Sequence, residues 1–378
     1  MDAPQGHTDP LRAKTRVESY VPLPITLLTG FLGSGKTTVL NHLVRTLPRT
    51  AILMNEFGEV ALDHQLLQKM EGPMALLSGG CVCCTISGSL SPTLKNLWMA
   101  RQKGDIPAFE RVIIEATGVA DPVPVLDNLL HDNWVRARYR LDGVVTTVDA
   151  VFGMSQLDEH FEAVKQVAVA DKLLLTKTDL APAEAVTALR ERLATLNPAA
   201  DILTVTNGEV APAAIQNLGL WNAETHSIEV VRWLKQARYK PARGGKLGQP
   251  ASAGKLGGKP QTECHDTRIQ AFSVMLDAPL DRYGLQSALN MLTSFRAENL
   301  LRFKAIVNVQ DEALPVVLHG IQHVLYPEVQ LDAWPDDDHR SRFVFIVRDL
   351  DPEFVAKLLA DFTGAARGQV AADTQNPS

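Results

Sequence analysis

The sequence lacks the features of a membrane-spanning, secreted or disulfide-stabilised protein. No apolar run reaches the roughly 18 residues that a membrane-spanning helix needs. Residues 1–18 are polar and lack the apolar core of a signal peptide. Only four cysteines occur among the 378 residues, which is too few for a disulfide framework in a chain of this length. We therefore expect a cytoplasmic protein with no membrane partner.

A strong excess of charge is lacking as well. The formal net charge is −6, which argues against general nucleic-acid binding, so no nucleic-acid partner is expected. Charged residues make up 21% of the chain and hydrophobic residues 46%, as in an ordinary globular protein. The length of 378 residues favours two domains.

Short apolar runs alternate with helical patterns from about residue 21 to residue 207. Lys36–Thr46 and Ala183–Leu196 are two of the helical patterns. Such alternation is typical of βαβ units, so we predict an α/β domain with a mostly parallel sheet and helices on both faces. Ligands of such sheets bind at the carboxyl ends of the strands. The predicted strands are Ile25–Thr29, Thr50–Asn55, Arg111–Glu115, Gly143–Asp149, Lys172–Thr176 and Ile202–Thr206.

The segment Gly30–Thr37 has the pattern Gly-x-x-x-x-Gly-Lys-Thr between a predicted strand and a predicted helix. Backbone N–H groups of such a turn and of the following helix surround phosphate oxygens. Lys36 would reach the β- and γ-phosphates, and the Thr37 hydroxyl would hold Mg²⁺. A glycine-rich turn without a ligand is the alternative. The predicted nucleotide-binding residues here are Gly30, Gly33, Ser34, Gly35, Lys36, Thr37 and Thr38.

Two further motifs follow predicted strands. Glu115 ends a β-branched strand and Gly118 follows three residues later, a pattern that places an acid near Mg²⁺ and a glycine N–H near the γ-phosphate. Thr176, Lys177 and Asp179 resemble the guanine-reading element of GTPases. Asp179 would accept hydrogen bonds from guanine, whereas adenine would leave its carboxylate unpaired. The order of the motifs favours GTP over ATP.

The segment Asn55–Glu59 takes the chain position of a first switch loop. Carboxylates beside bound GTP are repelled by its phosphates unless a metal lies between them. Glu56 and Glu59 are therefore candidates for holding Mg²⁺, positioning water or binding a second metal. Two surface acids without a role are the alternative.

Three cysteines, Cys81, Cys83 and Cys84, follow two glycines on what we predict to be a short loop. Their thiolates could supply three of the four tetrahedral positions of Zn²⁺ or Co²⁺, with Glu59, a histidine, water or a partner as the fourth ligand. Three small buried residues beside the sheet are the alternative. Residues whose part in this site the sequence leaves open are Cys264, His131, His319 and His323.

Residues 240–262 are rich in Lys and Gly and contain no acidic residue. A packed core cannot be built from this composition, so we predict a flexible linker, with a basic tether for a partner or RNA as the alternative. Beyond it we predict an α+β domain with a helix over Asp281–Asn299 and another from Asp351 to about Phe362. Its predicted strands are Ile269–Leu276, Arg302–Val309, Pro315–His319 and Arg342–Val347.

These observations predict five parts of the chain. They are a disordered N-terminus (1–20), a P-loop GTPase domain (21–225), a connecting segment with the flexible linker (226–267), a smaller α+β C-terminal domain (268–365) and a tail (366–378).

Taken together, the motifs resemble the CobW-like family of P-loop GTPases, which is related to the nickel-insertion GTPases of urease and hydrogenase maturation. The similarity covers about residues 22–362, and the Cys-x-Cys-Cys motif after a phosphate loop is its most specific mark. It implies a GTP-dependent metallochaperone, with zinc as the commonest cargo and Co²⁺ or Ni²⁺ in some members. The chain departs from the family in its Lys/Gly-rich linker, where many members are rich in histidine, and in Ala305, where members often have Gly.

The predicted function is therefore hydrolysis of GTP to control a metal ion that passes to an unidentified client metalloprotein. The predicted metal-binding residues are Cys81, Cys83, Cys84 and Glu59, with Thr37 for Mg²⁺. Two alternatives remain: a P-loop kinase of a small molecule, and a GTP-switched binding protein with a structural metal. The residues assigned to catalysis are Lys36, Thr37, Glu115 and Glu56.

Overall fold

A computed structural model describes residues 21–54, 67–69, 74–77, 81–85, 90–218, 269–365 and 370–372. For the short segments 67–69, 74–77, 81–85 and 370–372, it describes the backbone alone. The predicted N-terminal segment, the Asn55–Glu59 segment and the Lys/Gly-rich linker lie outside the described residues.

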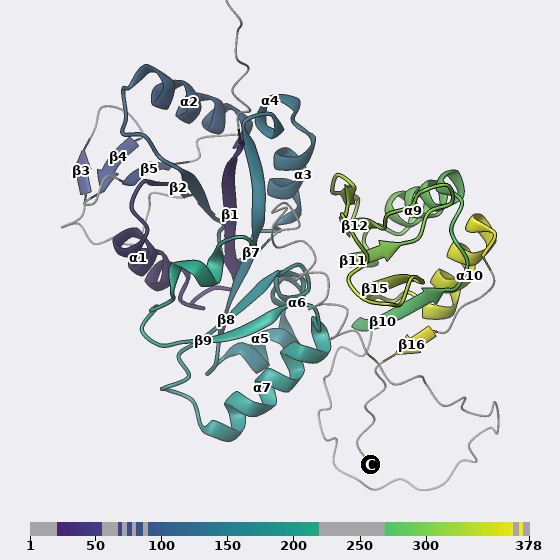
Figure 1. Ribbon diagram of the computed structural model, residues 1–378. Coiled ribbons are helices and arrows are strands. Elements are labelled where there is room, and N and C mark those ends of the chain that lie inside the picture. Colours follow the sequence, from purple (N-terminus) through teal and green to yellow (C-terminus); the bar gives the residue numbers. More distant parts are fainter. Residues whose placement is uncertain are drawn as a thin grey trace, which may run out of the picture.

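The N-terminal domain is built on a nine-stranded, mostly parallel sheet (Figure 1), which confirms the predicted fold class. The strand order is β3-β4-β5-β2-β6-β1-β7-β8-β9. All neighbours from β5 to β9 in this order run parallel, and β3 and β4 add antiparallel pairs at one edge. The strands are β1 (Leu23–Gly30), β2 (Thr50–Met54), β3 (Leu67–Lys69), β4 (Met74–Leu77), β5 (Cys81–Thr85), β6 (Arg111–Glu115), β7 (Tyr139–Asp149), β8 (Lys172–Thr176) and β9 (Asp201–Val205).

Helices cover both faces of this sheet, because successive strand residues point to opposite sides. Leu28 packs in a core with α1, whereas its neighbour Leu27 packs in a second core with α2 and α3. Leu173 and Leu175 of β8 form a third core with α5, α6 and α7. The helices are α1 (Lys36–Thr46), α2 (Leu90–Lys103), α3 (Val123–His131), α4 (Asn133–Arg136), α5 (Gly153–Glu159), α6 (Phe161–Ala168) and α7 (Ala183–Leu196), with a 3-10 turn at Pro212–Ile215.

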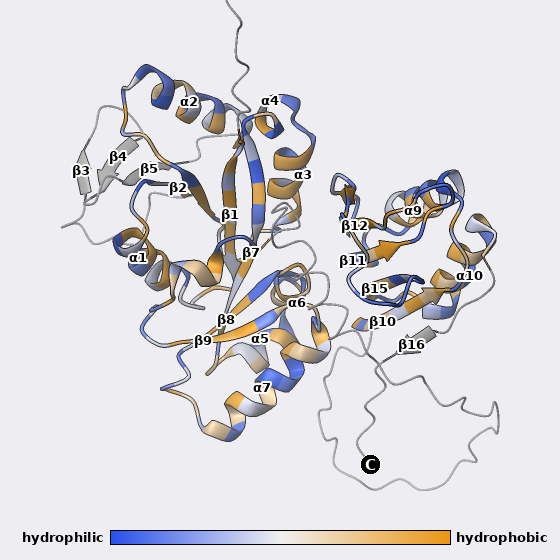
Figure 2. Ribbon diagram, in the orientation of Figure 1, coloured by the Kyte–Doolittle hydropathy of each residue, from blue (hydrophilic) through white to orange (hydrophobic). Residues whose placement is uncertain are grey.

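The C-terminal domain is a separate antiparallel sheet with two helices against it (Figures 1 and 2). The order along its main path is β13-β12-β11-β15-β10-β16, and β14 pairs with β12. Asp281 and Asp351 cap its helices by accepting hydrogen bonds from Gly284 N and Glu353 N. Its elements are β10 (Ile269–Leu276), α9 (Arg282–Phe295), β11 (Leu300–Val307), β12 (Val316–Ile321), β13 (Val324–Leu325), β14 (Val329–Gln330), β15 (Ser341–Arg348), α10 (Pro352–Thr363) and β16 (Val370–Ala372).

Two segments differ from the sequence-based expectation. The cysteines lie on strand β5, hydrogen-bonded to β2 and β4, and not on a loop. Part of the predicted tail forms β16, which pairs with Phe272–Val274 of β10. Both strands are short, and each gains hydrogen bonds from a strand that is distant in the chain, β2 for β5 and β10 for β16, which local patterns do not reveal.

The two domains meet along α3, α6 and α7 (Figure 1). Ile321 and Val324, from the hairpin of β12 and β13, belong to the same hydrophobic core as Leu126 and Leu130 of α3. Ala168 at the end of α6 packs in a cluster with residues of the C-terminal sheet. The C-terminal domain therefore contacts α3, which follows strand β6, and α6, which precedes strand β8.

Candidate nucleotide site

The Gly30–Thr37 loop joins the carboxyl end of β1 to the N-terminus of α1. At Gly30 the backbone has a φ of 143°, and a Cβ placed there would lie 2.2 Å from Thr147 Oγ1. Glycine is required at this position because any side chain would collide with β7. The last residue of β1 therefore lies in close contact with β7, and α1 begins at Lys36.

Lys36 lies at the start of α1 and is buried. Its Nζ donates hydrogen bonds to Gly30 O (2.8 Å) and Phe31 O (3.0 Å), so the ammonium is held over the loop. Burial lowers the pKa of Lys36, and the nearby charge of Glu115 opposes that shift. A buried cation of this kind is favoured by an anion, and phosphate oxygens are suitable acceptors.

Glu115 reaches the loop from the neighbouring strand. β1 and β6 pair in parallel with Leu28 opposite Glu115, which brings this carboxylate beside the helix N-terminus. Thr37 Oγ1 donates a hydrogen bond to Glu115 Oε1 (3.2 Å). Burial raises the pKa of Glu115, while Lys36 and the Thr37 hydrogen bond oppose the shift. A hydroxyl beside a carboxylate is the kind of oxygen ligand set that fits Mg²⁺.

The segment after β6 crosses the phosphate loop at Gly118. A Cβ on Gly118 would lie 2.8 Å from Leu32 N, so only glycine permits this approach of two backbones. Gln166 of α6 donates from Nε2 to Gly118 O (3.0 Å) and to Ala120 O (3.4 Å). Gln166 was not predicted from the sequence, because a single glutamine in an amphipathic helix belongs to no motif.

The end of β8 supports the loop from the other side. Thr176 Oγ1 donates to Ser34 O (2.8 Å), so this residue of the predicted guanine-reading motif also fixes the phosphate loop. Lys177 has a φ of 56°, and its Nζ pairs with Asp149 Oδ2 at 2.7 Å. Asp179 is exposed. Asp149, at the end of β7, was missed because its partner Lys177 follows a different strand, β8.

These elements enclose a pocket of about 490 Å³, within the usual range for small-molecule sites. It brings together most of the predicted phosphate-binding residues, Glu115, Gly118 and Lys177, and Asp179 is not among its lining residues. The lining residues are Leu32, Gly33, Gly35, Lys36, Thr37, Thr38, Met54, Glu115, Ala116, Thr117, Gly118 and Lys177.

Strand β5 carries the cysteines next to this pocket. Cys83 pairs with Ile52 and Cys84 with Leu53 in the parallel ladder with β2. The same ladder pairs Thr85 with Met54, which lines the pocket. The backbone of the cysteine strand is thus one strand away from the nucleotide site, while Glu56 and Glu59 lie outside the described residues.

The predicted histidine candidates have different surroundings. His131 Nδ1 lies 2.8 Å from Asp127 Oδ1, and His323 Nε2 lies 3.9 Å from the same oxygen. His319 is buried, and its Nε2 accepts a hydrogen bond from Arg302 Nε at 3.1 Å. In the part of the chain that the structure describes, no group of three or more His, Cys, Asp and Glu side chains has a metal-binding arrangement.

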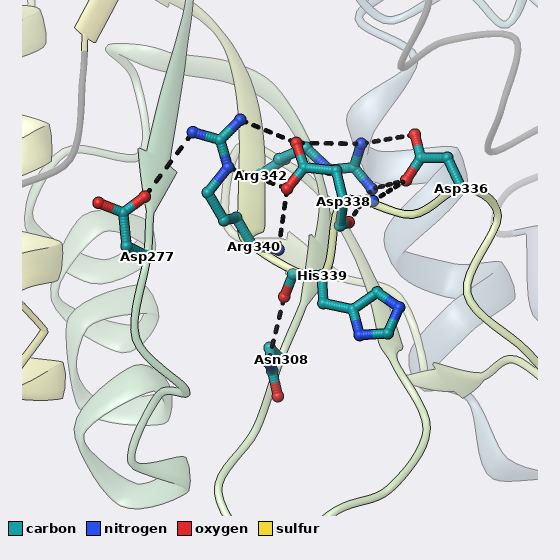
Figure 3. Close-up of polar contacts among 7 residues, drawn as sticks. All are labelled: Asp277, Asn308, Asp336, Asp338, His339, Arg340 and Arg342. Carbon is teal, nitrogen blue, oxygen red and sulfur yellow. Dashed lines mark hydrogen bonds and ion pairs between the residues drawn. The ribbon is translucent and has the colours of Figure 1, made fainter.

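A polar cluster in the C-terminal domain pairs most of its charged groups with one another (Figure 3). Arg340 pairs with Asp338 at 2.8 Å and lies 3.7 Å from Asp277. Arg342 forms two hydrogen bonds to Asp336, at 2.8 and 2.9 Å. These paired charges brace the turn before β15, so the cluster is structural.

None of the helices within the described residues has the length and apolar character required to cross a bilayer.

A glycine-rich turn between strand and helix, a buried lysine and a carboxylate on the adjacent strand define a P-loop nucleotide-binding protein. Residues 24–204 match the CobW/HypB/UreG nucleotide-binding domain, and residues 269–363 match the cobalamin synthesis protein CobW C-terminal domain. The chain belongs to the CobW family of the CobW/HypB/UreG proteins, which confirms the resemblance seen in the sequence.

Two characterised relatives cover nearly the whole chain. The zinc chaperone YjiA of Escherichia coli is 33% identical over 342 residues, which are 90% of this chain and 98% of YjiA. The zinc chaperone CobW of Pseudomonas aeruginosa is 30% identical over 385 residues, covering 91% of this chain and 92% of that protein. The crystal structure of Zn(II)-bound YjiA GTPase aligns with a TM-score of 0.69, 30% identity and coverage of 90% of this chain and 99% of that one.

Proposed function

We propose that the protein is a GTPase that acts as a zinc metallochaperone, with the nucleotide state controlling zinc at Cys81, Cys83 and Cys84. The observation that carries the proposal is the ladder between β5 and β2. It joins the cysteine strand to Met54, which lines the pocket. Relatives that match almost the full length are named zinc chaperones, and one is named a GTPase.

When a nucleotide binds, Lys36 would replace its hydrogen bonds to the loop by hydrogen bonds to the phosphates. Its ammonium would leave the carbonyl oxygens of Gly30 and Phe31 and bind the β- and γ-phosphates. Thr37 and Glu115, already within 3.2 Å of each other, would hold Mg²⁺ directly or through its water. Mg²⁺ would neutralise charge that develops on the phosphates during hydrolysis.

The base would lie at the end of β8, where Thr176, Lys177 and Asp179 follow one another. Asp149 holds the Lys177 ammonium at 2.7 Å, which orients the lysine stem along the side of the pocket. Asp179 is exposed and close in sequence, so its carboxylate is available for guanine. This arrangement supports GTP as the substrate and GDP and phosphate as products.

Zinc is the cargo in this proposal, and Co²⁺ or Ni²⁺ are alternative ions for the same thiolates. Glu59 is proposed as a further ligand and Glu56 as a water- or Mg²⁺-positioning residue, both in the segment after β2. That segment continues from β2 in sequence and β5 pairs with β2, so GTP would change the geometry of the thiolates and hydrolysis would release zinc to a client metalloprotein.

Zinc release during a single turnover tests the proposal. Protein loaded with one zinc ion is mixed with GTP and a chromophoric zinc indicator, and phosphate release is followed in parallel. We expect zinc to appear with phosphate, and Lys36→Ala to release neither, because the phosphate-binding ammonium is gone. Zinc that stays bound through complete hydrolysis would favour a GTP-switched protein with a structural metal. Equal turnover of ATP would favour a small-molecule kinase.

A further inference from the structure

Helix α6 contacts the nucleotide site through a buried side chain. Gln166 is 1% exposed, and its amide nitrogen donates to the carbonyl oxygens of Gly118 and Ala120. The preceding residue, Lys165, forms an ion pair with Asp121. The loop between β6 and α3 therefore has two backbone carbonyls and one carboxylate held by α6.

The corner before α6 touches the phosphate loop as well. The ring of His160 stacks on Phe31, with 4.7 Å between ring centroids. Gln156 of α5 donates from Nε2 to Leu32 O at 3.3 Å. A displacement of either nucleotide-binding loop would thus reach α6 through several direct contacts.

The other end of α6 is bound by the C-terminal domain. Arg302 of β11 is 2% exposed, and its Nη1 donates to Val169 O at 2.7 Å and to Ala170 O at 2.5 Å. These carbonyls directly follow Ala168, the last residue of α6. A cation there is also favoured by the helix dipole. Arg302 pairs in addition with Asp171, which precedes β8.

The start of α6 meets the same domain. The guanidinium of Arg348, at the end of β15, lies 3.9 Å from the ring centroid of Phe161. Near the last turn, Ala168 packs with Ala271, Leu301 and Ile346, which come from three neighbouring strands. The C-terminal sheet therefore contacts both ends of the helix whose Gln166 holds the Gly118 loop.

We propose that α6 transmits the nucleotide state from the Gly118 loop to the C-terminal domain, with Gln166 and Arg302 as its positioning residues. The proposal rests on the GTP switch proposed above, since the loop must respond to the γ-phosphate. An eight-residue helix spans about 12 Å and moves as a unit, so a shift imposed at Gln166 is also imposed at Arg302. GTP would thereby change the C-terminal domain as well as the cysteine strand.

Hydrogen exchange of the full-length protein, with GDP and with a non-hydrolysable GTP analogue, tests this coupling. In the wild type we expect the amides of Leu300–Val307 to exchange at rates that differ by about 5-fold or more between the two states, the low end of typical couplings. Gln166→Met keeps the length of the side chain and removes the donor, so this difference should disappear. Glu162→Gln, an exposed change on the same helix, should preserve it.

Arg302→Lys tests the other end without removing the charge beside Asp171. We expect the Gly118 loop to keep its nucleotide-dependent exchange while Leu300–Val307 loses it. Arg340→Lys is the matched control, since Arg340 also pairs with aspartates in the C-terminal domain but does so in the turn before β15. The control should behave as the wild type.

Three results would overturn the coupling. The first is a wild type in which exchange of the Leu300–Val307 amides does not depend on the nucleotide. The second is a Gln166→Met variant that keeps this dependence, and the third is a Glu162→Gln variant that loses it. The second result would assign transmission to α3, through Ile321 and Val324. The proposed chaperone function is judged separately, because zinc release on hydrolysis does not depend on this measurement. If zinc is released on hydrolysis while exchange of the C-terminal amides does not depend on the nucleotide, only the proposed role of α6 is rejected.

Discussion

In the proposed function, the choice of base depends on the side chain of Asp179. Asp179→Asn exchanges an acceptor for an amide, which leaves a guanine N–H unpaired and matches the ring of xanthine nucleotides instead. We expect GTP affinity to fall by about 10-fold or more, the effect of one unsatisfied hydrogen bond, and affinity for xanthosine triphosphate to rise. Equilibrium binding of both nucleotides measures this.

Glu184→Gln, an exposed change on α7, is the control for Asp179→Asn and should bind GTP normally. A wild-type protein that binds ATP as tightly as GTP would contradict the guanine assignment, whatever the variant does.

His319 gives the domain interface a dependence on pH. Burial and the charges of Arg302 and Lys304 lower the pKa of His319 well below its ordinary value, although Asp171 opposes them. Below pH 6.5 the unfolded chain therefore binds a proton that the folded protein excludes, and the free energy of unfolding falls as pH falls. From pH 7.5 to 5.5 this one group lowers stability by about 1 kcal/mol.

His319→Gln keeps an acceptor for Arg302 but cannot take up a proton. We expect its stability to fall by about 1 kcal/mol less than that of the wild type between pH 7.5 and 5.5. Urea unfolding at the two pH values, followed by fluorescence, measures the difference. Equal losses in both proteins would show that His319 accepts a proton in the folded state.

At the scale of elements, the loop between β6 and α3 is held at two places. Gly118 lies against the backbone of Leu32, and Gln166 fixes its carbonyl oxygen. Gly118→Ala would place a methyl group 2.8 Å from Leu32 N, so the loop must withdraw. We expect kcat for GTP to fall by about 100-fold, the usual loss for one misplaced donor, and GDP affinity to change less.

Val119→Ala, an exposed change in the same loop, is the control for Gly118→Ala and should retain turnover. Steady-state phosphate release and GDP binding separate the two effects. Normal turnover by Gly118→Ala would show that this loop takes no part in hydrolysis.

Elements with local signals were predictable, and those that depend on distant partners were not. Glycine and lysine spacing, a preceding apolar run and a following helical pattern identify the Gly30–Thr37 loop within about 20 residues of sequence. The helix caps at Asp281 and Asp351 were equally local. Strand β5 was predicted as a loop because two glycines precede its cysteines, and its parallel hydrogen bonds come from the distant strand β2, which no short-range pattern records.

The same distinction applies to side chains of the site. Lys36, Thr37 and Glu115 belong to motifs, and the structure brings them together at the strand ends. Gln166 and Arg302 act on carbonyl groups that lie 48 and 133 residues away in sequence. Their contacts exist only once the sheet and the second domain have assembled, so one sequence without an alignment contains no signal for them.

In the whole molecule, the proposed function places two coupled sites on one sheet, the nucleotide pocket and the cysteines of β5. Cysteine thiols bind metal only after losing their protons, and zinc would be the largest local charge near β5. If β2 and its following segment tie that ion to the pocket, GTP must change zinc affinity and zinc must change GTP affinity by the same factor. Cys83→Ser should remove the coupling while GTP still binds, because no phosphate contact is assigned to Cys83.

The most direct test is a zinc titration against a competing chelator, run with GDP and with a non-hydrolysable GTP analogue, on the wild type and Cys83→Ser. The account predicts wild-type zinc affinities that differ between the two nucleotides by roughly 5- to 150-fold, the usual span of such couplings, and no difference in the variant. Identical wild-type affinities in the two states would contradict nucleotide control of zinc and leave a GTPase with a structural metal.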